Sequence, residues 1–191
     1  MKRPAPAARR RYSLDDYFMV ELESVTRHEF LGGEIFAMAG ASLAHNHITS
    51  NVHALLRTRL RRGGCSAFTS DLRIATPGGL YTYPDVSVFC GAVELVAGRP
   101  DTATNPVLLV EVLSDATRDY DRGEKFELYK KIPSLTEYLT IEQEAVRIEH
   151  WHRGRRGGWT ATVHTRRNAL VRLNTGPVAL SLADIYRATL R

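Results

Sequence analysis

The sequence has only two cysteines, Cys65 and Cys90, among its 191 residues. Two cysteines give neither the disulfide framework of a small secreted protein nor a CxxC pair for metal or redox chemistry. We therefore expect both to be buried thiols. Cys90 has no identifiable neighbouring base that would activate a thiolate, so a cysteine nucleophile is not expected.

Long hydrophobic runs are also missing. No apolar stretch approaches the roughly 20 residues that cross a bilayer, and 25% of the residues are charged. The basic start of the chain, residues 1–11, has no apolar segment after it, which is unlike a secretory signal and typical of a flexible basic arm. We expect a soluble, cytoplasmic protein without a membrane partner, in which residues 12–191 form one domain.

Several catalytic signatures are absent. The sequence contains no GxSxG, no HExxH and no GxxxxGKS or GxGxxG loop, which argues against the enzyme classes built on them. His45 and His47 are two apart on an expected helix and point roughly 200° apart, so they cannot share a metal. His150 and His152 would share one face of a strand but lack further ligands nearby, and we expect surface or interface residues.

Positive charge is in moderate excess. The net charge is +5 and the sequence pI is near 9.4, which on its own is weak evidence for a polyanionic partner. Solvated helix faces and a hairpin tip explain the basic clusters equally well. These clusters lie in the arm and at Arg57, Arg59, Arg61, Arg62, Arg153, Arg155 and Arg156.

The spacing of apolar residues and the turn signals predict a mixed α/β (α+β) protein. Ser13 begins a short capped helix, and Gly32-Gly33 joins the strands 27–31 and 34–38 in a hairpin. A long helix over 42–62 carries His45 on its apolar stripe. Further strands are expected at 66–74, 83–90, 107–113, 137–141, 146–151, 159–165 and 169–173, with helices at 120–131 and 181–190.

Two of the expected strands each carry one acidic residue. The segment 107–113 is an apolar run interrupted only by Glu111, a pattern typical of a strand covered on both faces. An unpaired, ionised carboxylate there would be costly, so Glu111 should meet a cation, a metal or a strong donor. Asp85 poses the same question one strand earlier.

Other polar groups are expected to point inward with these two acids. Lys125 lies between Leu128 and Tyr129 on the sheet-facing side of its helix, so its ammonium either reaches solvent or meets an acid beneath. Carboxylates favour hard cations such as Mg²⁺ or Mn²⁺ over zinc. A hard metal held by two or three acids beside a lysine suits phosphodiester hydrolysis. The candidates are Glu34, His45, Asp71, Asp85, Glu111 and Lys125.

A series of motifs runs through nearly the whole chain in the order GGE, ASLAHNHI, SDLRI, YPDVSVF, LLVEVLS and YDRGEKFELYKKIPSLTEYL. This series resembles the Uma-two family of restriction endonucleases. The resemblance implies the PD-(D/E)xK nuclease fold: a restriction-endonuclease-like central mixed sheet flanked by helices, here with an N-terminal helix-hairpin and a C-terminal β-meander. It also implies Mg²⁺-dependent cleavage of DNA, with Mn²⁺ as a substitute, by Asp85 and Glu111 as metal ligands and Glu34 as a third.

One position departs from that family pattern. The usual lysine two residues after the second acid is replaced by Leu113, and strand alternation would have put it beside Glu111. Lys125, which matches the lysine of the family's DRGEK segment, is the expected replacement that orients the attacking water and stabilises charge on the phosphate. His45 matches the family's HNxI position and would hydrogen-bond a metal ligand or a phosphate.

Each candidate also has a purely structural alternative. Asp85 and Glu111 would then be neutralised by Arg73 or Lys125 in an ion-pair network. The other structural alternatives are a water-facing strand end for Glu34, a core imidazole bonded to a backbone carbonyl for His45, and a salt bridge with Arg73 for Asp71.

The sequence thus predicts a metal-dependent endonuclease acting on DNA. The main alternative is a catalytically inactive nuclease fold that binds DNA or another protein, because the strand lysine is missing. Duplex cleavage would favour a homodimer, since two-fold symmetry matches two strands. A third alternative is a scaffold that dimerises through its C-terminal strands and acts on no nucleic acid.

Overall fold

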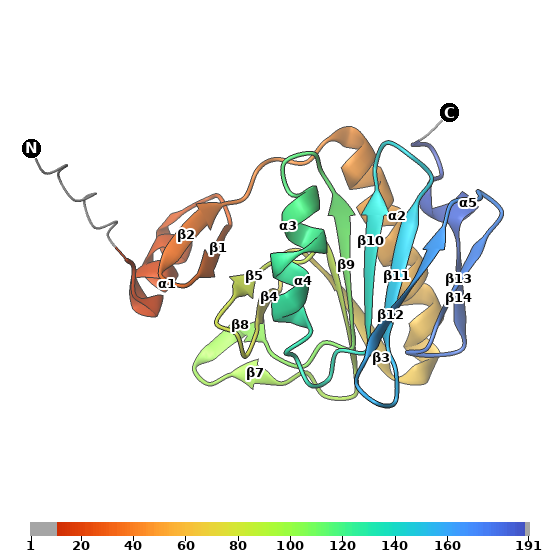
Figure 1. Cartoon of the computed structure of the whole chain (residues 1–191). Helices are drawn as coiled ribbons and strands as arrows, with labels where there is room; N and C mark the ends of the chain where they lie inside the picture. Colours follow the sequence, from red (N-terminus) through yellow and green to blue (C-terminus); the bar gives the residue numbers. More distant parts are fainter. Residues whose placement is uncertain (1–10, 190–191) are drawn as a thin grey trace, which may run out of the picture.

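The computed structural model describes residues 11–189, so the expected basic arm lies outside the described residues except for Arg11. A six-stranded central sheet, in the order β12-β11-β10-β9-β6-β3, organises the chain (Figure 1). It is mixed, because β9 and β10 are parallel and the other neighbours are antiparallel. Its strands are β3 (Cys65–Thr69), β6 (Val86–Cys90), β9 (Leu108–Leu113), β10 (Glu137–Glu142), β11 (Ile148–Arg153) and β12 (Trp159–His164).

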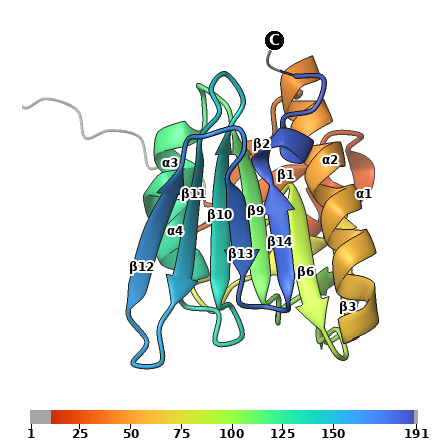
Figure 2. The same cartoon turned by 90° about the vertical axis from the view of Figure 1, so that its right-hand side faces the viewer.

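One face of the central sheet is covered by the long helix α2 (Leu43–Leu60) and by the hairpin of β13 (Leu170–Leu173) and β14 (Val178–Ser181) (Figure 2). Ile48, Val52 and Leu56 of α2 are fully buried against the sheet. The predicted long helix is therefore confirmed, and a 3-10 turn, η1 (Arg61–Gly63), follows it. The segment after β13 differs from expectation, since β14 precedes a short helix α5 (Leu182–Ile185).

The opposite face is covered by two short helices, α3 (Arg118–Arg122) and α4 (Glu124–Tyr129). Phe126 of α4 stacks on Tyr138 of β10 with ring centroids 4.7 Å apart. The sequence predicted one continuous helix here, and the structure breaks it at Gly123, whose φ and ψ of −106° and −105° are not helical. A Cβ at this position would lie 2.9 Å from the Asp119 carbonyl oxygen, so glycine allows the break.

A second, smaller sheet extends the molecule at its N-terminal side, where α1 (Leu14–Glu23) packs on the first hairpin (Figure 1). Ser13 caps α1 as predicted. The strand expected at 66–74 divides between the two sheets as β3 and β4, whereas the strand expected at 83–90 shortens to β6. The segment between the strands expected at 83–90 and 107–113 contains β7 and β8. The second sheet, in the order β2-β1-β5-β4-β8-β7, comprises β1 (His28–Leu31), β2 (Glu34–Ala37), β4 (Arg73–Ala75), β5 (Tyr81–Thr82), β7 (Leu95–Val96) and β8 (Arg99–Ala103).

The two cysteines form a disulfide, so the expectation of buried thiols is wrong. Cys65 opens β3 and lies directly opposite Cys90, the last residue of β6. Antiparallel pairing therefore brings their side chains together from positions 25 residues apart in the sequence, with the Cα atoms 4.0 Å from each other. No helix in residues 11–189 is long and apolar enough to cross a membrane.

Candidate functional site

Asp85 and Glu111 meet at one end of the central sheet, as the sequence predicted. Asp85 immediately precedes β6, and β6 pairs with β9 so that Val86 lies opposite Val110. The Val112 amide donates to Asp85 Oδ2 at 2.7 Å, and the Asp85 amide lies 3.4 Å from Glu111 Oε2. The strand pairing itself therefore holds the two carboxylates together.

Lys125 reaches this pair from helix α4. Its ammonium lies 2.9 Å from Glu111 Oε1, and only 6% of its side chain is exposed. The Tyr129 hydroxyl, one turn further along α4, donates to the same oxygen at 2.8 Å. The prediction that Lys125 points toward the sheet is confirmed. At the usual lysine position of β9, Leu113 is fully buried.

Two further acids that the sequence did not identify surround Lys125. Its ammonium lies 2.9 Å from Glu29 Oε1 and 3.2 Å from Asp121 Oδ1. Glu29 comes from β1 and also accepts a hydrogen bond from the Thr82 hydroxyl. Asp121 lies four residues before Lys125, at helical spacing, and its buried Oδ1 has an ion-pair contact but no hydrogen bond. The N-terminal hairpin therefore contributes directly to the cluster.

His45 closes the cluster from the first turn of α2. The Ser42 side chain caps this helix by accepting from the His45 amide, and the imidazole Nε2 lies 3.2 Å from Asp85 Oδ2. Burial opposes an imidazolium, but the hydrogen bond and charge of Asp85, together with the Val112 carbonyl, raise the pKa of His45 above its usual value. His45 therefore contacts one of the predicted metal ligands, as expected, and is not a purely apolar core residue.

The cluster contains more acids than bases. Burial raises the pKa of Glu111 to about 8 against the opposing charge of Lys125, and the charges of Asp121 and Asp85 add to the rise. Burial alone would lower the pKa of Lys125, but the surrounding groups, led by Glu111, hold it well above its usual value. Lys125 therefore stays charged at neutral pH. The four acids are Asp85, Glu111, Glu29 and Asp121, against Lys125 and His45.

The donor types fit a hard divalent cation, because carboxylate oxygens are what Mg²⁺ prefers and an acid excess favours a further positive charge. Asp85 and Glu111 are the adjacent pair that could hold it. Within residues 11–189, no group of three histidine, cysteine, aspartate or glutamate side chains is already arranged to hold a metal ion. A complete ligand set is therefore not preformed.

The two remaining sequence candidates lie elsewhere. Glu34 opens β2 opposite Leu31, which places it on the same side of the hairpin as Glu29 but further along. Asp71 lies in the turn after β3, with its side chain 87% exposed, and pairs with Arg27 at 3.6 Å. The expected Asp71–Arg73 salt bridge is wrong. Arg73 is instead buried and pairs with acids that include Glu21 and Asp101.

His150 also differs from expectation. It is buried rather than on the surface, and its Nε2 lies 2.8 Å from Glu137 Oε1. Among the basic clusters, Arg59 and Arg153 bind backbone carbonyls of their own domain, including those of Ala179 and Pro133 respectively. Part of the positive charge therefore has a structural role.

Comparisons with known proteins show what this chain is similar to. Residues 14–184 match a family described as "Uma2: Putative restriction endonuclease". The chain is 37% identical over 180 residues to "Uncharacterized protein slr1290" of Synechocystis sp., covering 92% of this chain and 91% of that protein. It is 35% identical over 155 residues to "Uncharacterized protein sll1609" of the same organism, covering 81% and 88%.

One solved structure shares the fold. It is described as "a putative nuclease belonging to DUF820" from Anabaena variabilis, and it aligns with a TM-score of 0.74 over 91% of this chain and 97% of that chain. The sequences are only 18% identical, so the likeness concerns the fold. The expected nuclease-like architecture, a mixed sheet with helices on both faces, is confirmed.

Proposed function

Because the chain belongs to the Uma2 family, we propose that it is a Mg²⁺-dependent endonuclease that hydrolyses phosphodiester bonds in DNA. The observation that carries this proposal is the contact between Lys125 and Glu111 beside Asp85. Helix α4 thus provides the lysine that is missing from β9, where Leu113 occupies the usual lysine position. A hard divalent cation fits this set of donors. When bound, it would polarise the phosphate and lower the pKa of a bound water.

The residues have separate roles in this proposal. Asp85 and Glu111 would hold the cation, and the Val112 amide fixes the orientation of the Asp85 carboxylate. Despite its burial, the surrounding groups hold the pKa of Lys125 well above its usual value, which favours a charged ammonium over a general base. Lys125 would bind a phosphate oxygen, orient the attacking water and stabilise the negative charge that develops.

A third acid is proposed from the N-terminal hairpin. The sequence pointed to Glu34, whereas Glu29 is the hairpin acid that contacts Lys125 at 2.9 Å. We infer that Glu29 holds the ammonium in place beside Glu111. His45 would similarly hold Asp85, because its Nε2 lies 3.2 Å from the carboxylate. Both would act by positioning, without contacting the reacting atoms.

Nicking of supercoiled DNA tests the proposal. Wild type should nick with Mg²⁺ or Mn²⁺ and stop when EDTA is added, whereas Asp85→Asn and Glu111→Gln should lose about a hundredfold or more. Glu144→Gln is the matched control, because Glu144 is exposed in the turn after β10. Equal nicking by all four purified proteins, after a background nuclease has been excluded with a mock purification, would rule the assignment out.

A second candidate function is a nuclease fold that binds DNA or another protein without cutting. Leu113 at the usual lysine position favours it, as does the absence of a preformed three-ligand group within residues 11–189. Fluorescence anisotropy with labelled duplex DNA separates the two. A binding module should bind in EDTA, weaken steeply with salt and tolerate Asp85→Asn. An enzyme should instead show metal-dependent cleavage that the same substitution abolishes.

A further inference from the structure

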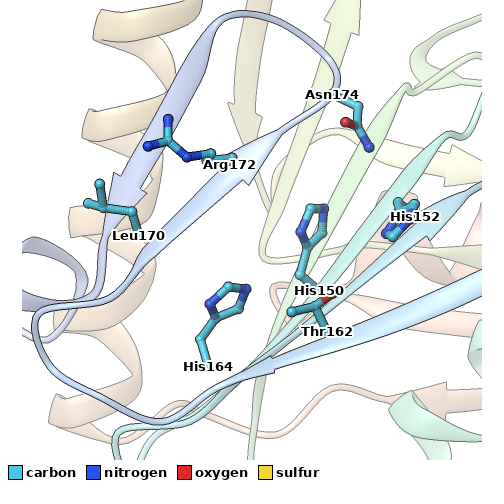
Figure 3. Close-up of a pocket in the computed structure, with 7 residues that line it drawn as sticks. All are labelled: His150, His152, Thr162, His164, Leu170, Arg172 and Asn174. Carbon is cyan, nitrogen blue, oxygen red and sulfur yellow. The ribbon is translucent and has the colours of Figure 1, made fainter.

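A polar pocket lies on the face of the central sheet that is opposite the cluster around Lys125. Val110 and Leu139 face α2, and the register of β10 and β11 places His150 and His152 on that same face. The pocket has a volume of about 260 Å³ and opens between β11, β12 and β13 (Figure 3). Its lining residues are His150, His152, Thr162, His164, Leu170, Arg172 and Asn174.

Strand pairing gathers these histidines. Positions two apart on a strand share a face, so His150 and His152 lie together with ring centroids 5.8 Å apart. Thr162 lies opposite His150 on β12, and His164 lies diagonally next to it, opposite Ile148. Asn174, which directly follows β13, points toward His150, whereas the Arg172 side chain on β13 extends along the strand toward Leu170 at the rim of the pocket (Figure 3). Two strands and a separate hairpin thus contribute to one pocket.

The Glu137 carboxylate lies on the same face of the sheet as His150 and His152, next to the pocket, and its oxygens accept several hydrogen bonds. Glu137 is fully buried and accepts from the Asn174 amide at 2.9 Å, the Thr175 amide at 2.7 Å and His150 Nε2 at 2.8 Å. Burial would raise the pKa of Glu137, but these hydrogen bonds outweigh it and lower the pKa. Glu137 therefore anchors His150 and the end of β13, and it is not among the residues that line the pocket.

We propose that this pocket binds an oxyanion of the phosphate class. All of its polar lining groups can donate hydrogen bonds, namely a guanidinium, three imidazoles, an amide and a hydroxyl. Arg172 supplies a permanent positive charge, and an aspartate or glutamate is absent from the lining. Another pocket of the molecule, by contrast, is lined by Asp15, Glu21 and Asp101 as well as by arginines. The proposal does not depend on the nuclease proposal, because it concerns different residues on the other face of the sheet.

The histidines make binding depend on pH. Burial and the neighbouring His150 lower the pKa of His164, which favours the neutral imidazole in the free protein. A bound anion favours imidazolium, and binding should therefore strengthen as the pH falls through the range in which histidine titrates. The charged and titratable groups around the pocket are Glu137, His150, His152, His164 and Arg172.

The test uses the full chain and inorganic phosphate, with histidine ring resonances followed by NMR at pH 6 and pH 8. Phosphate should shift the ring signals of His152 and His164 and should bind more tightly at pH 6. Arg172→Gln should weaken binding about tenfold or more, because a charge-assisted hydrogen bond is lost. Arg172 is exposed, so the variant should fold. Arg155→Gln, at the exposed tip between β11 and β12, is the matched control and should bind like wild type.

Two further ligands identify the source of the phosphate group. A nucleoside 5′-monophosphate that binds more tightly than phosphate assigns the pocket to nucleotides, and a 5′-phosphorylated oligonucleotide that binds more tightly than its dephosphorylated form assigns it to a nucleic-acid end. Equal affinity for all phosphate-bearing ligands assigns it to the free anion. The proposal is overturned if chloride at equal ionic strength causes the same shifts, or if Arg172→Gln keeps wild-type affinity.

Discussion

At the scale of residues, the position of an ammonium matters more than the element that carries it. Lys125 lies on α4 and not on β9, yet its Nζ is 2.9 Å from Glu111 Oε1, which is within ion-pair distance. Its charge is retained because several acids surround it. A buried lysine without such partners would lose its proton or its place in the core. The acids and the lysine therefore stabilise one another.

The two acids of the N-terminal hairpin can be separated by a matched pair of substitutions. Glu29→Gln removes a charge-assisted contact to Lys125 at 2.9 Å, and we expect DNA nicking to fall about tenfold or more. Glu34→Gln should change nicking less than Glu29→Gln does. Initial nicking rates at saturating Mg²⁺ check both, with thermal melting as a control for folding. The reverse order of effects would return the role to Glu34.

The sequence located Asp85, Glu111 and Lys125 because each is an ionisable group in an apolar pattern, where burial demands a partner. It did not locate Glu29, whose burial depends on how the first hairpin docks against α4. Asp121 could have been found, since it lies four residues before Lys125 in the same segment.

A buried carboxylate outside that cluster predicts a pH-dependent contribution to stability. Hydrogen bonds lower the pKa of Glu137 in the folded protein, so it stabilises the fold above the pKa of an unfolded glutamate and loses this effect as the pH falls through its folded value. Glu137→Gln should reduce the free energy of unfolding by about 2 kcal/mol at pH 7. The difference from wild type should shrink toward pH 3. Urea unfolding at pH 7, 5 and 3 measures it, and a difference that grows with acid would contradict the assignment.

At the scale of elements, the break between α3 and α4 positions the lysine. Gly123 lacks the Cβ that would lie 2.9 Å from the Asp119 carbonyl oxygen, and α4 starts at the next residue. Gly123→Ala should therefore destabilise the fold by about 1 to 3 kcal/mol and reduce nicking by displacing Lys125. Gly158→Ala is the control, because its Cβ would meet nothing within 4 Å. Equal melting temperatures for the two variants would show that the break tolerates a side chain.

Long periodic elements were predictable, whereas their interruptions were not. The apolar stripe of α2 and the alternation or apolar run of β9 to β12 are local signals that tertiary structure did not override. The strand expected at 66–74 instead divides at the turn near Asp71, because its halves pair with different partners: β3 with β6 and β4 with β5. Such a division depends on contacts distant in sequence. The disulfide depends on the same pairing, since only the β3–β6 register places Cys65 opposite Cys90.

At the scale of the whole molecule, the central sheet within residues 11–189 ends in two terminal strands, β12 with six residues and β3 with five. The described partner of β12, the longer of the two, is β11 alone. An edge of six residues presents unpaired backbone donors and acceptors that a second copy can pair with. Cleavage of both strands of a duplex by an enzyme with one site per chain also favours a two-fold dimer. We therefore propose that the protein forms a homodimer by antiparallel pairing of β12 with β12.

A lysine placed on this edge should prevent the pairing without disturbing the fold. Val163 of β12 has 46% of its surface exposed and lies opposite Glu149, which offers a partner for the new charge. Val163→Lys should therefore be monomeric in light scattering, whereas wild type is a dimer, because like charges would meet across the symmetric edge. Leu22→Lys on α1, at a site that is 79% exposed, is the control for an added charge and should remain dimeric. A monomeric wild type, or a dimeric Val163→Lys, would place any duplex-cutting assembly elsewhere. If Val163→Lys nicks one strand at the wild-type rate but no longer makes double-strand breaks, the dimer and the catalytic cluster act as separate parts of the function.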